Sequence, residues 1–281
     1  MQPAPIVPRP TLWPVFVAYL VAFLLAFVAS AIYLIVPAVL RAGSNPERIA
    51  NEAVTFAFSA PGLLGAALVS ALMLALVTLV TARLLGGDIA TRLHVRRTRA
   101  RPLGVAAAVV GLAGLSLACG GAAQLAGLGK AGVTESIALA LRSSNPTRIV
   151  LAVLAIGIAP AFAEEGFFRG LMQTRLRARW TRWPAILVTA LAFGVFHVDP
   201  IQGSQAFIAG VFFGWVADRF GGIRSTIAAH AVNNAVFVVV ASLEGPGDPA
   251  TRAATIGVLV GGLAVCGAAI AVIRSRYALR A

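Results

Sequence analysis

Long apolar stretches separated by short polar segments are the dominant pattern along this chain. An α-helix needs about 20 apolar residues to cross the hydrocarbon core of a bilayer. Helices are also the only open-ended elements that satisfy their own backbone hydrogen bonds in lipid. The pattern therefore predicts an all-α fold, a polytopic transmembrane bundle of about eight spans. We expect these spans at Leu12 to Leu40, Thr55 to Ala82, Leu103 to Leu128, Arg148 to Leu171, Trp183 to Val198, Ser204 to Ala217, Ser225 to Leu243 and Ala254 to Ile273.

Composition excludes a soluble domain, because 59% of the residues are hydrophobic and only 12% are charged. The formal net charge of +13 suggests nucleic acid at first sight. However, the basic residues fall in short blocks between apolar spans, mainly in segments 83–101, 175–182 and 274–280. Such blocks are typical of cytoplasmic loops that face anionic lipid. We therefore expect both termini in the cytoplasm, anionic lipids as partners and no nucleic acid.

The placement of polar residues divides the chain into three parts. Residues 1–147 form an N-terminal transmembrane region with spans one to three. Residues 148–243 carry the ionisable residues that lie within apolar segments, and we expect the catalytic core there. Residues 244–281 supply a last span and a basic tail. The richness in Ala, Gly and Arg indicates an integral protein of a bacterial cytoplasmic membrane.

Spans five and six are shorter than a bilayer requires, at about 1.5 Å of rise per residue. Their connection, from Asp199 to Gly203, is polar and contains the helix-breaking Pro200. We predict that the two spans form a hairpin whose apex is buried within the protein. This arrangement would place His197, at the end of span five, near the membrane interior.

Two adjacent glutamates, Glu164 and Glu165, lie in span four, although the chain has only 10 acidic residues. Ionisable groups in hydrocarbon are costly unless they are paired or face a wet cavity. Glu165 and Arg169 are four residues apart, so they can pair on one helix face. Glu164 then points elsewhere, and a bend at Pro160 can turn it toward a cavity. The alternative is a helix end at which all three charged side chains reach water.

Further polar side chains occur at helical spacing in later spans. Phe193 and His197 are four residues apart in span five, and His230 and Asn234 share one face of span seven, with Asn233 turned aside. Polar groups within a membrane need a partner, because an unsatisfied one is costly there. Hydrogen bonding between helices is the simpler explanation for these residues.

Together, Glu164, His197, His230 and Asn234 offer a base, two imidazoles and an amide. This set suits hydrolysis of an acyl bond, with a carboxylate that takes a proton from water and an amide that stabilises an oxyanion. Glu164, His197 and His230 are equally a candidate three-ligand site for a divalent metal such as zinc. The residues alone leave both possibilities open.

Two other functions fit the same residues. Buried Glu and His side chains can relay protons in a proton-coupled transporter. Such carriers commonly have paired repeats with broken helices, and this chain shows no internal symmetry of that kind. A catalytically inactive scaffold that binds membrane peptides is the other alternative.

Three ordered motifs carry a resemblance to a known family: Glu-Glu-x-x-x-Arg from Glu164, Phe-x-x-x-His from Phe193, and His-x-x-x-Asn from His230. The pattern resembles the type II CAAX prenyl endopeptidases, also called the CAAX protease and bacteriocin-processing family. Gly210 and Gly214, at small-x-x-x-small spacing, also look like that family's sixth span. The resemblance covers roughly residues 148–240.

The resemblance implies a glutamate-dependent intramembrane endopeptidase acting on a peptide or membrane-protein substrate. By motif match, Glu164 would activate water, with His197, His230 and Asn234 around it. Glu165, Arg169 and Phe193 would support the site, the first two as an ion pair. Members are often described as metalloproteases, so the resemblance leaves a divalent metal such as zinc as a candidate cofactor.

Overall fold

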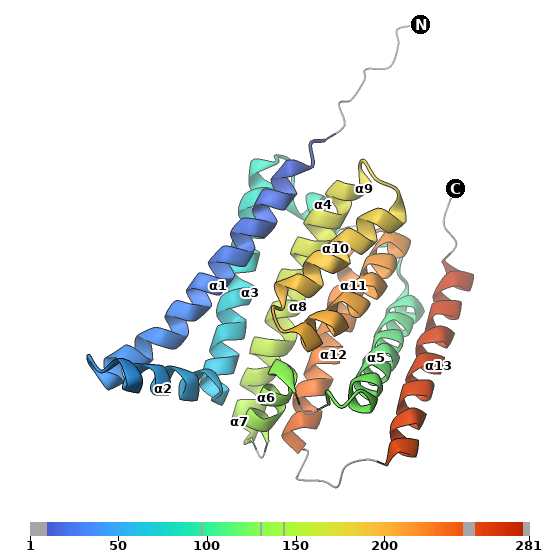
Figure 1. Ribbon diagram of the computed structural model, residues 1–281. Coiled ribbons are helices and arrows are strands. Elements are labelled where there is room, and N and C mark those ends of the chain that lie inside the picture. Colours follow the sequence, from blue (N-terminus) through green and yellow to red (C-terminus); the bar gives the residue numbers. More distant parts are fainter. Residues whose placement is uncertain (1–9, 97, 130, 143, 244–250, 278–281) are drawn as a thin grey trace, which may run out of the picture.

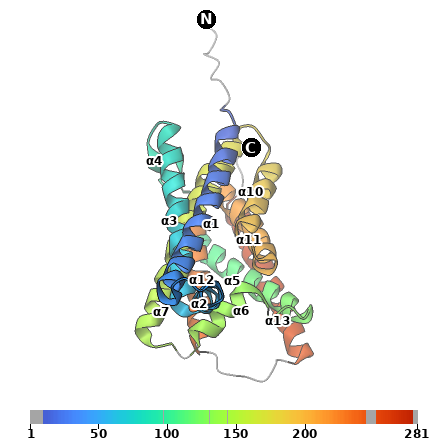
Figure 2. The ribbon, with the colours of Figure 1, turned by 60° about the vertical axis from the view of Figure 1, so that its left-hand side comes forward.

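The computed structural model describes residues 10–96, 98–129, 131–142, 144–243 and 251–277 (Figures 1 and 2). All regular structure in these residues is helical, which confirms the predicted all-α class. The helices are α1 (Trp13–Ala42), α2 (Pro46–Ala57), α3 (Ala60–Leu84), α4 (Ile89–Arg92), α5 (Pro102–Leu125), α6 (Gly132–Leu141), α7 (Pro146–Ala152), η1 (Val153–Ile158), α8 (Ala159–Glu164), η2 (Glu165–Gln173), α9 (Thr174–Arg177), α10 (Arg182–Phe196), α11 (Pro200–Phe220), α12 (Arg224–Leu243) and α13 (Arg252–Arg276).

Six of the described helices are long and apolar enough to cross a membrane. They are α1, α3, α5, α12, α13 and the continuous helix Pro146–Arg177, which runs from α7 to α9. The chain is therefore an integral membrane protein. Two of the eight expected spans, α10 and α11, are not among the six: α10 has only 15 residues, and α11, although 21 residues long, carries several polar side chains.

Two segments expected to be loops contain helices. α2 lies where we expected the connection after the first span, and α6 lies before Pro146–Arg177. The expected second span also started too early, because Thr55 belongs to α2. The side chain of Ser59 caps α3 and Pro61 occupies its first turn, so α3 begins at Ala60.

The helices pack as a central group between two flanking pairs (Figure 1). α1 packs against α3 on one side, and α5 packs against α13 on the other. Between them, Pro146–Arg177 contacts α3, α10 and α12. α10 and α11 pack together as the predicted hairpin, but its apex is not buried as expected, because Val198 is 65% exposed. This arrangement brings the motif-bearing segments into the middle of the bundle.

The N-terminal end of α1 and the C-terminal end of α13 lie at the same end of the bundle, together with α4 and α9 (Figure 1). α2 lies at the opposite end of α1 and α3 (Figures 1 and 2). We call the first the basic end, because it carries Arg92, Arg96, Arg175, Arg177, Arg179, Arg182 and Arg274. Residue 97 and residues 278–281 of the basic segments lie outside the described residues. The sidedness of the membrane and the three-part division of the chain stay predictions.

Asp199 fixes the turn of the hairpin. Its Oδ1 atom accepts hydrogen bonds from the backbone N–H groups of Ile201 and Gln202, which caps α11. Its Oδ2 atom accepts one from the N–H of Val133, at 3.3 Å, in the first turn of α6. Val198 has a φ of 61°, a strained conformation for a β-branched residue. The carboxylate thus holds the strained end of the hairpin against α6.

Candidate active site

The long helix Pro146–Arg177 is irregular where it carries the polar residues. Two π-helical segments, η1 and η2, lie on either side of α8, which contains Pro160. Proline has no N–H, so it cannot donate to the carbonyl of Ile156, four residues earlier. The Asn234 side chain in α12 donates to that carbonyl instead, with an Nδ2 to O distance of 3.2 Å. π-helical turns of this kind are frequent at functional sites.

Glu165 and Arg169 form the expected ion pair. Their Oε1 and Nη1 atoms are 2.7 Å apart, and neither side chain is exposed. The guanidinium also donates to the carbonyl of Gly210 in α11 at 3.2 Å. It lies over the rings of Phe193 and Phe213, 4.4 and 4.9 Å from their centroids. Aromatic faces and a backbone carbonyl therefore also contact this buried cation.

His230 lies between the two glutamates. Its Nδ1 atom is 3.2 Å from Glu165 Oε1, and its Nε2 atom is 3.6 Å from Glu164 Oε2. An ionised carboxylate only accepts hydrogen bonds, so Nδ1 carries a proton and donates a hydrogen bond to Glu165. The Glu164 side chain is 13% exposed, whereas that of Glu165 is fully buried. Glu164 is thus the carboxylate of the pair that water can reach.

His197 follows the last residue of α10, next to the hairpin turn. Its Nδ1 atom is 2.8 Å from the carbonyl oxygen of Phe193. A carbonyl only accepts, so Nδ1 carries the proton and Nε2 is left for another partner. The Phe193 ring contacts both imidazoles, with centroid distances of 4.9 Å to His197 and 6.1 Å to His230. Phe193 therefore links the two histidines, which the structure does not bring into direct contact.

The segment that carries these residues matches a known protein family. The model described as Type II CAAX prenyl endopeptidase Rce1-like matches residues 146–236. This segment is therefore similar to the Rce1-like family. The match contains every candidate site residue from Glu164 to Asn234 and confirms the resemblance found in the sequence. No curated protein and no solved structure matches the chain.

The Rce1-like family indicates a CAAX-type intramembrane protease, a hydrolase with a peptide or protein substrate. The matched segment ends within α12, so α1 to α6 and α13 lie outside it. The motif residues therefore come from Pro146–Arg177, the α10–α11 hairpin and α12, and the other helices surround them.

The candidate metal ligands of the Rce1-like segment are only partly brought together. Glu164 and His230 are neighbours, but His197 makes no contact with either among the interactions of the described residues. Within the same residues, no group of three or more His, Cys, Asp or Glu side chains could hold a metal ion. This arrangement does not fit the three protein ligands of a catalytic zinc site.

Sequence analysis missed Gln173 in the Rce1-like segment. This buried side chain lies four residues after Arg169 and donates to the carbonyl of Gly214 at 2.9 Å. Arg169 and Gln173 therefore bind the carbonyls of Gly210 and Gly214, which are also four residues apart. A Cβ atom at Gly214 would lie 2.7 Å from Gln173 Oε1, so this close approach requires glycine. The signal in the sequence was the shared spacing of the two pairs.

Asn233 is turned away from this group, as expected. Its Oδ1 atom accepts a hydrogen bond from the Ser116 hydroxyl in α5, at 2.8 Å. Asn234, on the adjacent face, reaches the π-helical segment near Glu164. The side chains of Asn233 and Asn234 thus form hydrogen bonds with different helices.

Proposed function

We propose that this protein is an intramembrane endopeptidase that hydrolyses a peptide bond of a membrane-associated or peptide substrate with water activated by Glu164. The observation that carries the proposal is the placement of His230 between one buried, paired glutamate and one partly exposed glutamate. The family match supports the same reaction class. We also propose a bacterial cytoplasmic membrane, with the basic end on the cytoplasmic side.

Glu165 and Arg169 position the imidazole of His230 in this proposal. The charge of Glu165 is balanced by Arg169 at 2.7 Å, so this carboxylate is already engaged in an ion pair. Glu165 accepts a hydrogen bond from the Nδ1–H group of His230, so the Nε2 atom, which carries a lone pair, faces Glu164. This is the general arrangement in which one group orients the imidazole that serves the reaction.

Glu164 and His230 then hold the reacting water between them. The 3.6 Å between Oε2 and Nε2 is longer than a hydrogen bond and is a separation that one water can bridge. Glu164 takes a proton from that water as the hydroxide oxygen adds to the scissile carbonyl carbon. Glu164 then returns the proton to the leaving amide nitrogen as the carbon–nitrogen bond breaks. The products are a new carboxylate and a new amine.

His197 and Asn234 are proposed to contact the substrate carbonyl. Asn234 uses one N–H on the carbonyl of Ile156, and its amide has a second N–H. The Nδ1 atom of His197 is engaged by the carbonyl of Phe193, so its Nε2 atom is the one proposed to face the substrate. Donors aimed at the developing oxyanion stabilise it most where water is excluded. No step in this mechanism passes through a metal ion.

The test compares purified wild-type protein with Glu164→Gln on a library of membrane-protein-derived peptides in detergent, read by mass spectrometry. Glu135→Gln is the matched control, because Glu135 is a carboxylate of α6 outside the site. We expect wild type and the control to release the same fragments and Glu164→Gln to release none. Equal cleavage by wild type and Glu164→Gln would overturn the role of Glu164. If wild type cuts no peptide, proton transport into liposomes becomes the assay for the competing function.

A further inference from the structure

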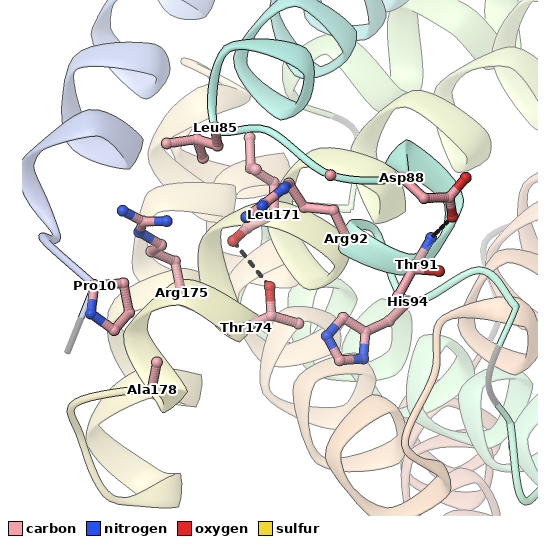
Figure 3. A pocket seen from close by; sticks show the side chains of 11 residues that line it. Pro10, Leu85, Asp88, Thr91, Arg92, His94, Leu171, Thr174, Arg175 and Ala178 are labelled. Atoms are coloured by element: carbon pink, nitrogen blue, oxygen red, sulfur yellow. Dashed lines mark hydrogen bonds between the residues drawn. The ribbon is translucent and has the colours of Figure 1, made fainter. Parts of the chain in front are cut away.

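A cavity of about 410 Å³ lies at the basic end (Figure 3), and Glu164 is not among the residues that line it. Its walls come from the end of α3, from α4 and the residues after it, and from the η2 to α9 part of the long helix. They include Leu85, Arg92, His94, Leu171, Thr174 and Arg175. The walls therefore combine two guanidinium groups with an apolar surface.

Arg92 and Arg175 have no acidic partner at this cavity. Arg92 Nε donates to the carbonyl of Gly86 at 2.6 Å, and Arg175 Nε donates to the carbonyl of Thr11 at 2.7 Å. Within the part of the chain that the structure describes, neither side chain forms an ion pair. Each guanidinium has five N–H donors, so most of them remain for a ligand.

The acidic residue at the cavity is already engaged. Asp88 Oδ1 is 3.4 Å from Arg96 Nη2, and Asp88 Oδ2 accepts from the N–H of Thr91 at 2.8 Å. Arg92 and Arg175, in contrast, are close enough for their charges to repel each other. A bound anion would relieve this repulsion and use the remaining donors.

Thr174 does not offer a donor to the cavity. Its hydroxyl bonds to carbonyls of its own helix, including that of Leu171 at 3.0 Å (Figure 3). The lining also includes the apolar residues Pro10, Leu85, Leu171 and Ala178. A ligand that fits must therefore combine an anionic group with an apolar part.

We propose that this cavity binds the phosphate group of an anionic phospholipid, with Arg92 and Arg175 as its donors. Guanidinium groups match the oxygens of a phosphate geometrically, often by two hydrogen bonds at once. The basic end carries the arginines that the distribution of charge assigns to the cytoplasmic leaflet, where anionic lipids are concentrated. The glycerol and the first methylene groups of the lipid would contact Leu85 and Leu171. The site is separate from the protease chemistry and does not depend on it.

Binding is measured on delipidated full-length protein in a neutral detergent, by calorimetry or native mass spectrometry. The probes are dioctanoyl phosphatidylglycerol, dioctanoyl phosphatidylcholine and inorganic phosphate. We expect saturable binding of phosphatidylglycerol that becomes about tenfold weaker or more in Arg92→Gln and in Arg175→Gln, because each loses charge-assisted hydrogen bonds. Arg276→Gln is the control, since Arg276 is an exposed arginine of α13 that does not line the cavity.

Several outcomes would overturn the proposal. One is equal binding of phosphatidylcholine and phosphatidylglycerol. Another is undiminished binding of phosphatidylglycerol by the double variant Arg92→Gln/Arg175→Gln. Inorganic phosphate that binds as tightly as the lipid, with the same dependence on the arginines, would assign the site to free phosphate and overturn the lipid. If a variant fails to fold, chemical modification of wild type by phenylglyoxal gives the answer. Phosphatidylglycerol should then protect Arg92 and Arg175 but not Arg276, and equal modification of all three would contradict the proposal.

Discussion

Replacement of Arg169 by methionine tests whether the buried ion pair holds the site together. Arg169 and Glu165 are unexposed and 2.7 Å apart, so the substitution leaves a carboxylate in the interior without its cation. Breaking a buried pair in this way costs about 3–5 kcal/mol. The lost contacts with the Phe193 and Phe213 faces and with the Gly210 carbonyl act in the same direction.

The assay is thermal unfolding of Arg169→Met in detergent, beside the double variant Glu165→Gln/Arg169→Met. We expect a loss on the order of 10 °C for the single variant, from the scaling of stability with melting temperature. The double variant buries no unpaired charge, so it should recover much of that loss. Arg276→Met, at an exposed position, serves as the control. A single variant that melts like wild type, or a double variant no more stable than the single one, would refute the reasoning.

Three further predictions concern packing, pH and metal. Gly214→Ala should destabilise the protein by about 1–3 kcal/mol, because the new Cβ atom would lie 2.7 Å from Gln173 Oε1. Gly257→Ala is the control and should not destabilise it, because a Cβ atom at Gly257 would have nothing within 4 Å. Thermal unfolding of both variants checks this. The hydrogen bonds from Thr91 hold the pKa of Asp88 below its ordinary value, so the cap of α4 is complete at neutral pH and is lost as the pH falls through that lowered pKa. Hydrogen exchange at Thr91, corrected for its intrinsic rate, should accelerate at low pH in wild type and show no such transition in Asp88→Asn. Only two of the three candidate metal ligands lie together, so we expect peptide cleavage to be insensitive to a chelator. The cleavage rate after treatment should stay within about twofold of the untreated rate. Complete loss of cleavage that zinc restores would contradict this.

Local spacing was enough to predict some of the site. Glu165 and Arg169 pair because residues four apart face each other on a helix, and this holds although the segment is π-helical. Asn233 lies about 100° around the helix from Asn234 and contacts Ser116 in α5 instead. The hairpin of α10 and α11 was predicted from two short apolar stretches and the polar connection between them. These features depend on neighbours in the sequence.

Contacts between residues far apart in the sequence could not be predicted from the spacing of polar and apolar positions. His230 and Glu165 are 65 positions apart, and nothing in the spacing indicates that one imidazole would face both glutamates. The hydrogen bond from Asn234 to the carbonyl of Ile156 depends on a π-helical turn. Packing between helices creates both contacts, so sequence analysis named the residues but not their partners.

Helix ends were predicted poorly for a local reason. We treated Asp199 and Pro200 as breakers, whereas Asp199 caps α11 and Pro200 occupies its first position. Proline is well suited to that position, since its missing N–H has no partner there in any helix. Asn45 and Pro46 start α2 in the same way. Attention to these cap and proline pairs would have found α2 and the correct start of α11.

The central claim is that Glu164 performs the chemistry and Glu165 only positions His230. The most direct test is the rate of peptide cleavage by Glu164→Gln and by Glu165→Gln/Arg169→Met, each with its melting temperature. We predict that Glu164→Gln keeps the melting temperature of wild type and loses about 10²-fold or more of the rate, the typical contribution of a general base. The double variant should retain more activity than Glu164→Gln. Cleavage by Glu164→Gln within a few-fold of wild type would contradict the account.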